Sequence, residues 1–309
     1  MTAPLTPNLK GALFMTLSMA GFTLNDACVK LVAETVPLFQ IVFLRGIATT
    51  ILLAVMVHVT TGLRLGVPGR DRPLVALRTL AEVAAMVAFL MALTNMAIAN
   101  ATAILAALPL AVTLGAALAF GDPVGWRRLT AIGVGFAGVM LIVQPGTAGF
   151  NIWSLSAVLA VAIITGRDLL TRAFSPEVPS MTVAVLTAAA VCVFGGVASS
   201  FTPWVPLGVH EVALILAASV LILGGYVFSI MVMRVGEVGF VSPFRYTSLV
   251  FALVVGLAVF GELPNTLALA GGAIVVATGA FTLLRERRVA RAAARASAAG
   301  AVTPGAPRG

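Results

Sequence analysis

Ten apolar stretches of about twenty residues divide this sequence, and they restrict its fold more than any other feature. A helix of that length crosses the hydrocarbon core of a bilayer, where only helices and closed barrels satisfy every backbone hydrogen bond. The composition agrees, because 60% of the 309 residues are hydrophobic and only 10% are charged. We therefore expect an all-α integral membrane protein and exclude a water-soluble enzyme. The expected transmembrane helices are 10–33, 38–61, 73–96, 98–120, 126–143, 152–174, 179–202, 210–233, 238–260 and 264–284.

The distribution of basic residues predicts the orientation in the membrane. With ten spans both chain ends lie on one side, and most of the 19 Lys and Arg residues then share that side. The connections on the other side carry none, so the positive-inside rule places both termini in the cytoplasm of a bacterial-type cytoplasmic membrane. The first apolar run continues past Asn25 and Asp26 without a convincing cleavage site, and we interpret it as an uncleaved span.

Two five-span halves account for nearly the whole sequence. We expect a cytoplasmic N-terminus (1–9), a first five-helix repeat (10–143), a second (152–284) and a basic, disordered cytoplasmic tail (285–309). The tail is rich in Ala, Gly and Arg and has too little apolar content to pack. Basic segments can bind nucleic acid, but directly behind a span the usual meaning is a topology signal, so no nucleic-acid partner is expected.

An internal repeat supports this division. Ala119-Phe120-Gly121-Asp122-Pro123 corresponds, at an offset of about 140, to Val259-Phe260-Gly261-Glu262-Leu263-Pro264. At a similar offset, Asp26-x-x-x-Lys30 of the first span corresponds to Asp168-x-x-x-Arg172 of the sixth. Because five is odd, the second half enters the membrane with opposite orientation, which predicts an inverted-topology repeat.

Short motifs in the first half resemble the EamA-type drug/metabolite transporters. They are Asn25-Asp26-x-x-x-Lys30, then Phe43-Leu44-Arg45-Gly46, and a small-residue fourth span with Pro109 that runs into Gly121-Asp122 and then Gly133, Gly135 and Gly138. The resemblance covers roughly residues 10–285. Family members usually have Glu where this chain has Asp122, which weakens a role for that position, whereas Glu262 is kept.

The resemblance implies a carrier without selecting one metabolite. The first two spans are most similar to bacterial members associated with riboflavin or S-adenosylmethionine uptake, although amino-acid exporters share much of the pattern.

Charged side chains at membrane depth are costly and are therefore the first functional candidates. Asp26 and Lys30 lie four residues apart on one helix face and could form an ion pair. Arg45 could join Asp26 or hold an anionic substrate group bidentately. The structural alternative is a fixed ion pair with Lys30 extended to the outer interface.

The sixth span contributes a second set of charges. Asp168 and Arg172 are again four apart and suggest a latch at the inner gate, whereas Arg167 should point elsewhere. Arg167 and Arg245 lack a local carboxylate, so their partners would be a substrate carboxylate or phosphate, or Asp168 and Glu82 from other helices. For Glu82 itself the favoured interpretation is a structural pair with Arg78.

Two tyrosines and two prolines complete the candidate list. A phenol inside a bilayer needs a hydrogen-bond partner, so Tyr226 and Tyr246 could line a pocket for a planar substrate. Pro109 and Pro243 remove backbone donors in equivalent spans of the two halves and should break those helices. Irregular backbone at that depth must line a cavity or be covered by protein, so both are candidate hinges or cavity walls.

These features favour a secondary carrier of a small polar organic metabolite that works by alternating access. No phosphate-binding loop with Lys occurs in the sequence, so energy would come from protons or from solute exchange. No cofactor and no metal are expected.

An intramembrane enzyme would need a catalytic pair, but Asp26 and Asp168 belong to opposite membrane faces. A passive channel would show a continuous polar stripe. One cavity fits within a monomer, and a homodimer is compatible with it.

Overall fold

The computed structural model describes residues 6–60, 66–122, 124–235 and 238–301, and within them it is built of helices. Ten segments of this part are long and apolar enough to cross a membrane, which confirms the ten predicted spans. The helices are α1 (Pro7–Val32), α2 (Leu38–Thr60), η1 (Gly69–Asp71), α3 (Arg72–Asn95), α4 (Ile98–Leu105), α5 (Leu108–Phe120), α6 (Trp126–Val143), α7 (Trp153–Arg172), α8 (Ser180–Ser199), α9 (Val209–Val235), α10 (Val238–Val241), η2 (Ser242–Tyr246), α11 (Thr247–Phe260) and α12 (Thr266–Ala301).

Proline breaks the fourth and the ninth span, as the sequence predicts. Pro109 stands in the first turn of α5, and its ring would clash with the carbonyl of Leu105, where α4 ends. Pro243 stands in the first turn of η2, a 3-10 segment between α10 and α11. Each of these spans is therefore made of shorter helical pieces.

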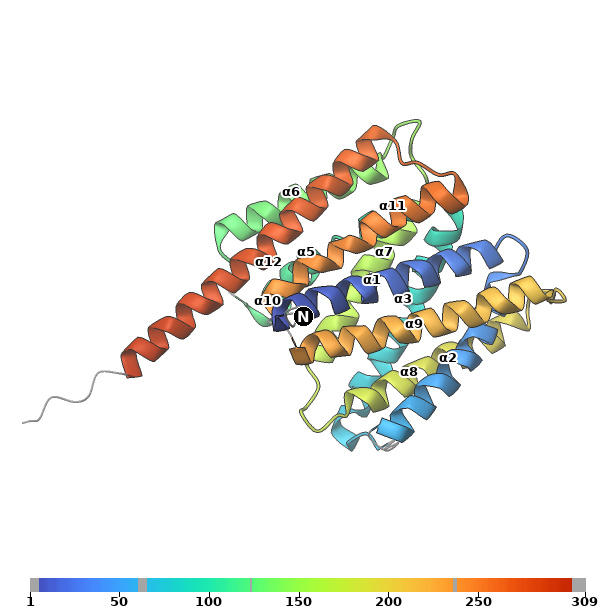
Figure 1. Ribbon diagram of the computed structural model, residues 1–309, viewed down its shortest axis with the longest axis horizontal. Helices are drawn as coiled ribbons and strands as arrows, with labels where there is room; N and C mark the ends of the chain where they lie inside the picture. The colour runs from blue at the N-terminus through green and yellow to red at the C-terminus, as the bar shows by residue number, and fades with distance from the viewer. Residues whose placement is uncertain (1–5, 61–65, 123, 236–237, 302–309) are drawn as a thin grey trace, which may run out of the picture.

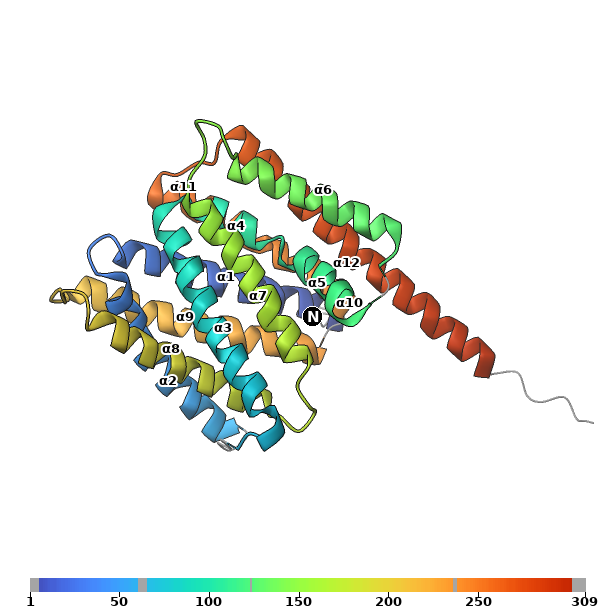
Figure 2. The same ribbon diagram turned by 180° about the vertical axis from the view of Figure 1, so that it is seen from behind.

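The helices associate in four extensive pairs. In Figure 1, α1 lies beside α9 and α12 crosses α6, and α2 packs against α8. Figure 2 shows the fourth pair, α3 with α7, on the other side of the molecule. Small residues bring backbones close in the α6–α12 pair, because a Cβ added to Gly138 would lie 2.9 Å from the carbonyl oxygen of Gly271.

The two ends of the bundle are packed differently. We call the end at which α1 begins the N-terminal face, and the end at which α1 finishes the opposite face. Near the opposite face one cluster of buried apolar residues, which we call the large cluster, joins α1, α2, α3, α4, α9 and α11. A second cluster of similar size joins α3, α4, α6, α7 and α12. Near the N-terminal face the clusters are smaller and separate. The large cluster contains Ala27, Val29, Val32, Val36, Ile41, Val42, Leu90, Leu93, Ile98, Ala99, Ile215, Ala218, Ala252 and Val255.

The last helix is longer than the span that it contains. α12 continues to Ala301, beyond residue 284 where the tenth span was expected to end. The prediction of a disordered tail is therefore wrong for residues 285–301, which are helical. Their content of Ala and Arg, both strong helix formers, accounts for this. Residues 302–309 lie outside the described part.

Candidate functional site

A cavity of about 300 Å³ lies among α1, α2, α3, α7, α8 and α9, and Leu105 of α4 also borders it. Its lining runs from Asp26 and Arg45, near the middle of the bundle, to Met56 and Met181, which lie close to helix ends at the N-terminal face. The cavity therefore extends from the middle of the bundle toward the N-terminal face and does not pass through the large apolar cluster near the opposite face. Its polar lining consists of Asn25, Asp26, Arg45, Thr49, Arg78, Glu82, Arg167, Thr187 and Tyr226.

Three of these residues form a chain of hydrogen bonds at the inner end of the cavity, which we call the Asn25 group. Arg45 Nη1 donates to Asn25 Oδ1 at 2.9 Å, and Asn25 Nδ2 donates to Asp26 Oδ1 at 2.9 Å. Asn25 and Arg45 are only 3% and 9% exposed. Asp26 and Arg45, both predicted site residues, thus meet through an amide that sequence reasoning did not single out.

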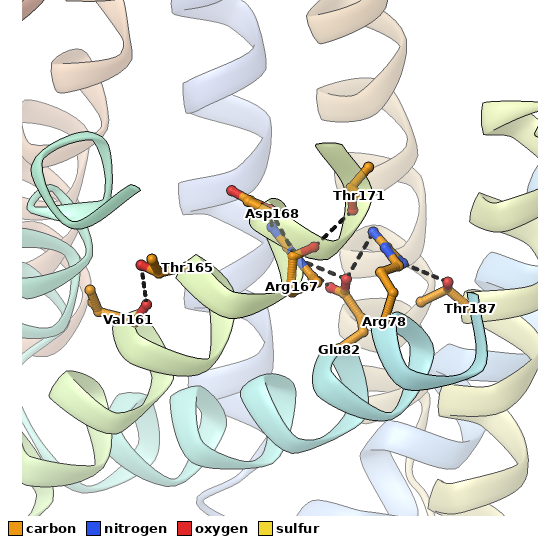
Figure 3. Close-up of polar contacts among 8 residues, drawn as sticks. All are labelled: Arg78, Glu82, Val161, Thr165, Arg167, Asp168, Thr171 and Thr187. Atoms are coloured by element: carbon orange, nitrogen blue, oxygen red, sulfur yellow. Dashed lines mark hydrogen bonds and ion pairs between the residues drawn. The ribbon is translucent and has the colours of Figure 1, made fainter. Parts of the chain in front are cut away.

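A second polar group lies closer to the N-terminal face, and we call it the α3–α7 cluster: Arg78, Glu82, Arg167 and Asp168. Arg167 Nη1 donates to both carboxylate oxygens of Glu82 at 3.0 and 2.9 Å, and its Nη2 pairs with Asp168 Oδ1 at 2.7 Å. Arg78 pairs with Glu82 at 3.1 Å. Figure 3 shows Glu82 between the two arginines, with Arg78 reaching Thr187 on α8. The predicted Arg78–Glu82 and Arg167–Glu82 contacts are therefore confirmed.

The predicted ion pair between Asp26 and Lys30 is wrong. Lys30 Nζ donates to both carboxylate oxygens of Glu262, at 2.7 and 2.9 Å, and to the carbonyl oxygen of Met96 at 2.7 Å. It also lies 4.9 Å from the ring centre of Phe260. Lys30 is one turn nearer the opposite face than Asp26, where α11 ends, so the carboxylate of Glu262 is the available partner.

The predicted pair between Asp168 and Arg172 is also wrong. Arg172 donates to the two oxygens of Asp122 at 2.6 and 3.1 Å and lies 4.6 Å from the ring centre of Phe120. Arg167 and Asp168 do not point apart as expected, because the long arginine side chain turns back to its neighbour. The hydrogen bonds from Arg172 hold the pKa of Asp122 below its ordinary value.

The two tyrosines have different surroundings. Tyr226 lines the cavity and makes an edge-to-face contact with Phe22, with ring centres 5.4 Å apart. Tyr246 is 7% exposed, and a Cβ at Gly279 of α12 would clash with its hydroxyl. Arg245 is exposed. Neither Tyr246 nor Arg245 is among the described residues that line this cavity, because η2 packs against α1 and α12 instead.

The proline breaks lie at different distances from the cavity. The α4–α5 break adjoins it through Leu105, just before Pro109. The break at Pro243 contributes no described residue to its lining. Among the described residues, no group of three or more His, Cys, Asp or Glu side chains could hold a metal ion.

Sequence reasoning missed three parts of this arrangement: the role of Asn25, the contact with Thr187, and the ion pairs made by Asp122 and Glu262. One signal for the last was present. The predicted internal repeat aligns Lys30 with Arg172 and Asp122 with Glu262 at offsets of 142 and 140, so a pair in one half could have been transferred to the other.

Comparison with known proteins finds similarity to membrane transporters. Residues 9–144 match the model of the EamA-like transporter family. The S-adenosylmethionine uptake transporter of Rickettsia prowazekii is 24% identical over 91% of this chain and 94% of its own length. The pseudopaline exporter CntI of Pseudomonas aeruginosa is 26% identical over 86% and 93%. A riboflavin transporter of Rhizobium johnstonii is 28% identical over 61% and 63%.

One solved crystal structure shares the fold. It superposes with a TM-score of 0.65 and 17% identity, and the match covers 90% of this chain and 98% of that one. At this identity the likeness concerns the fold alone.

Proposed function

This protein belongs to the EamA-like transporter family, and we propose that it is a secondary carrier that moves a small polar organic metabolite across the cytoplasmic membrane by alternating access. The family consists of transporters and not of enzymes. The chain is a multi-pass membrane protein with bacterial transporter relatives. We infer that its N-terminal face is cytoplasmic, as the distribution of basic residues predicts.

The observation that carries this proposal is a cavity with charged residues in its lining that extends from the middle of the bundle toward one face only. The apolar cluster and the Lys30–Glu262 pair close the opposite face, whereas the lining reaches helix ends at the N-terminal face. A carrier needs a second state with the closure reversed. A continuous pore would be open at both faces, so this arrangement favours a carrier over a channel.

Matched ion pairs at the two faces support an inverted repeat. Lys30 at the end of α1 pairs with Glu262, which follows the left-handed Gly261 (φ 63°) after α11. Arg172 at the end of α7 pairs with Asp122, which follows the left-handed Gly121 (φ 69°) after α5. An inverted repeat predicts one such closing contact at each face.

For the direction of transport we propose uptake, of a metabolite comparable to S-adenosylmethionine or riboflavin. Several relatives that match this chain over most of its length are named uptake transporters. The alternative is export, which the similarity to the pseudopaline exporter favours. Asp26, Glu82 or Asp168 could bind a coupling proton, or the carrier could exchange solutes. The cavity lies within one chain, so a monomer would suffice.

Counterflow in proteoliposomes tests this function. Vesicles that contain the full chain are loaded with unlabelled S-adenosylmethionine, riboflavin or a mixture of amino acids, and labelled substrate is added outside. A carrier gives transient accumulation that saturates with concentration. Linear flux without accumulation, together with single-channel currents, would contradict the proposal. Accumulation driven by an imposed pH gradient would assign protons as the coupling ion.

A further inference from the structure

The charged residues of the cavity differ in whether they have an ionic partner. Five charged side chains line it: Asp26, Arg45, Arg78, Glu82 and Arg167. The last three are paired with one another. Asp26 and Arg45 form no ion pair with any residue that the structure describes, although both lie within membrane-spanning helices. Charges at that depth are costly without a partner, so these two are the groups that a ligand would neutralise.

The Asn25 amide keeps this cation and this anion apart while it orients both. It accepts from Arg45 and donates to Asp26. A guanidinium has five donors and a carboxylate has about four acceptor positions, so each charge retains hydrogen-bonding capacity. Both side chains line the same cavity. A ligand there meets a positive and a negative group together.

A third polar residue, Thr49, lines the cavity beside these two charges. The hydroxyl oxygen of Thr49 is buried, and it has no hydrogen bond within the described part of the chain. Thr49 follows Arg45 by one turn of α2 and lines the cavity with it. A buried hydroxyl without a partner is unfavourable, and rotation of the Thr49 side chain about χ1 would turn its hydroxyl toward a ligand oxygen beside Arg45.

The walls next to these groups are apolar. Phe89, Leu90 and Val191 line the cavity, and Tyr226 lines it with its ring against Phe22. The remainder of a ligand held by its charges would therefore be apolar or aromatic.

We propose that the Asn25 group binds the ammonium and the carboxylate of one zwitterion, so that the transported metabolites carry an amino-acid moiety. The inference rests on the proposed carrier function and specifies its substrate class. Arg45 and Thr49 hold the carboxylate, and Asp26 holds the ammonium group. The α3–α7 cluster is internally paired and serves to position helices.

Binding measurements on the detergent-purified full chain test the substrate class. The standard L-amino acids and S-adenosylmethionine are compared with riboflavin and with nucleosides by thermal stabilisation. The best amino acid is then compared with its own amine and its own carboxylic acid; for phenylalanine these are phenethylamine and 3-phenylpropionate. We expect the zwitterion to bind about 30-fold or more tightly than either analogue, because each analogue leaves one buried charge without a partner.

Two variants assign the two charges. Asp26→Asn should weaken zwitterion binding by about 30-fold or more and leave the carboxylic acid nearly unaffected. Arg45→Gln should weaken the zwitterion similarly and leave the amine nearly unaffected. The exposed residues Glu177 and Arg127 provide matched controls, because Glu177→Gln and Arg127→Gln remove the same charges at the surface.

The outcomes separate this inference from the carrier function. Preference for a neutral or singly charged ligand, or no stabilisation by any zwitterion, overturns the inference, while saturable counterflow of another solute would leave the carrier function standing. If both variants lose affinity equally for the zwitterion, the amine and the carboxylic acid, the assignment of the two charges to Asp26 and Arg45 is overturned. If a variant fails to fold, the analogue series on the unmodified chain decides.

Discussion

The Lys30–Glu262 pair and the Arg172–Asp122 pair have the same design at opposite faces of the bundle. Each combines a cation at the end of a helix, a carboxylate that follows a left-handed glycine, and a phenylalanine beneath the cation. Their surroundings differ. The side chains of Lys30 and Glu262 are 9% and 31% exposed, whereas those of Arg172 and Asp122 are 52% and 39% exposed.

This difference agrees with the denser apolar packing near the opposite face. Lys30 lies among helix ends that share one large apolar cluster, and its other contact is the carbonyl oxygen of Met96. Arg172 has no comparable cover near the N-terminal face, where the clusters are separate. The Lys30–Glu262 pair should therefore contribute more to the stability of the fold than the more exposed Arg172–Asp122 pair. The reason is that a lower dielectric around an ion pair strengthens its attraction.

The largest expected effect is one of chemical access. In a chain with Cys28 and Cys192 replaced by Ser, a cysteine at Met181 should react rapidly with a hydrophilic maleimide, because that position lines the end of the cavity near the N-terminal face. A cysteine at Ala99, which is 2% exposed within the large apolar cluster, should react very slowly. Equal labelling rates would contradict the closed opposite face.

The second effect is loss of the buried pair. Glu262→Gln leaves the Lys30 ammonium without a charge partner and should destabilise the protein by about 2 kcal/mol, less than the 3–5 kcal/mol of fully buried pairs because Glu262 is partly exposed. Thermal unfolding measures this change. The double variant Lys30→Met, Glu262→Leu removes both charges and should recover much of the stability while altering transport. Failure to recover would indicate that the carboxylate acts through its bond to the Ile98 amide.

A third comparison concerns the two left-handed glycines. Gly261→Ala and Gly121→Ala place a Cβ at φ 63° and 69°, which costs about 1 kcal/mol or more. Among the described residues other than the chain neighbours of each glycine, no atom lies within 4 Å of a Cβ built at either position, so the strain should be similar. Transport should suffer more in Gly261→Ala, since that turn positions the carboxylate of the closed face. Equal transport in both variants would argue against a different state of the two faces.

The smallest effect is expected at Asp122. Arg172 holds the pKa of Asp122 below its ordinary value, so the pair stabilises the fold above about pH 4, the usual pKa of Asp, and this contribution disappears as the pH falls through the lowered pKa. Asp122→Asn should therefore lower the melting temperature slightly at pH 7, and this difference from the unmodified protein should shrink as the pH falls below about 4. A large change at pH 7 would show that this pair is as important as the one at Lys30.

Much of the fold was predictable because the bilayer imposes simple rules. Spans of fixed length, breaks at Pro109 and Pro243, and the cost of charges at depth all follow from local sequence. The charged residues Asp26, Arg45 and Arg167 were identified in this way, and the cavity contains all three. The inclusion of Tyr246 and Arg245 rested on depth alone, which does not determine the direction in which a helix face points.

The sequence alone determined the number of spans, their irregular points and the set of charges that must be satisfied inside the membrane. Which carboxylate pairs with each cation was decided only by the tertiary structure. Spacing of four residues suggested Asp26 with Lys30 and Asp168 with Arg172, yet Lys30 and Arg172 pair with residues 232 and 50 positions away. Helical spacing only makes a local pair sterically accessible, whereas Lys30 and Arg172 each donate to both oxygens of one carboxylate that the tertiary structure places beside them.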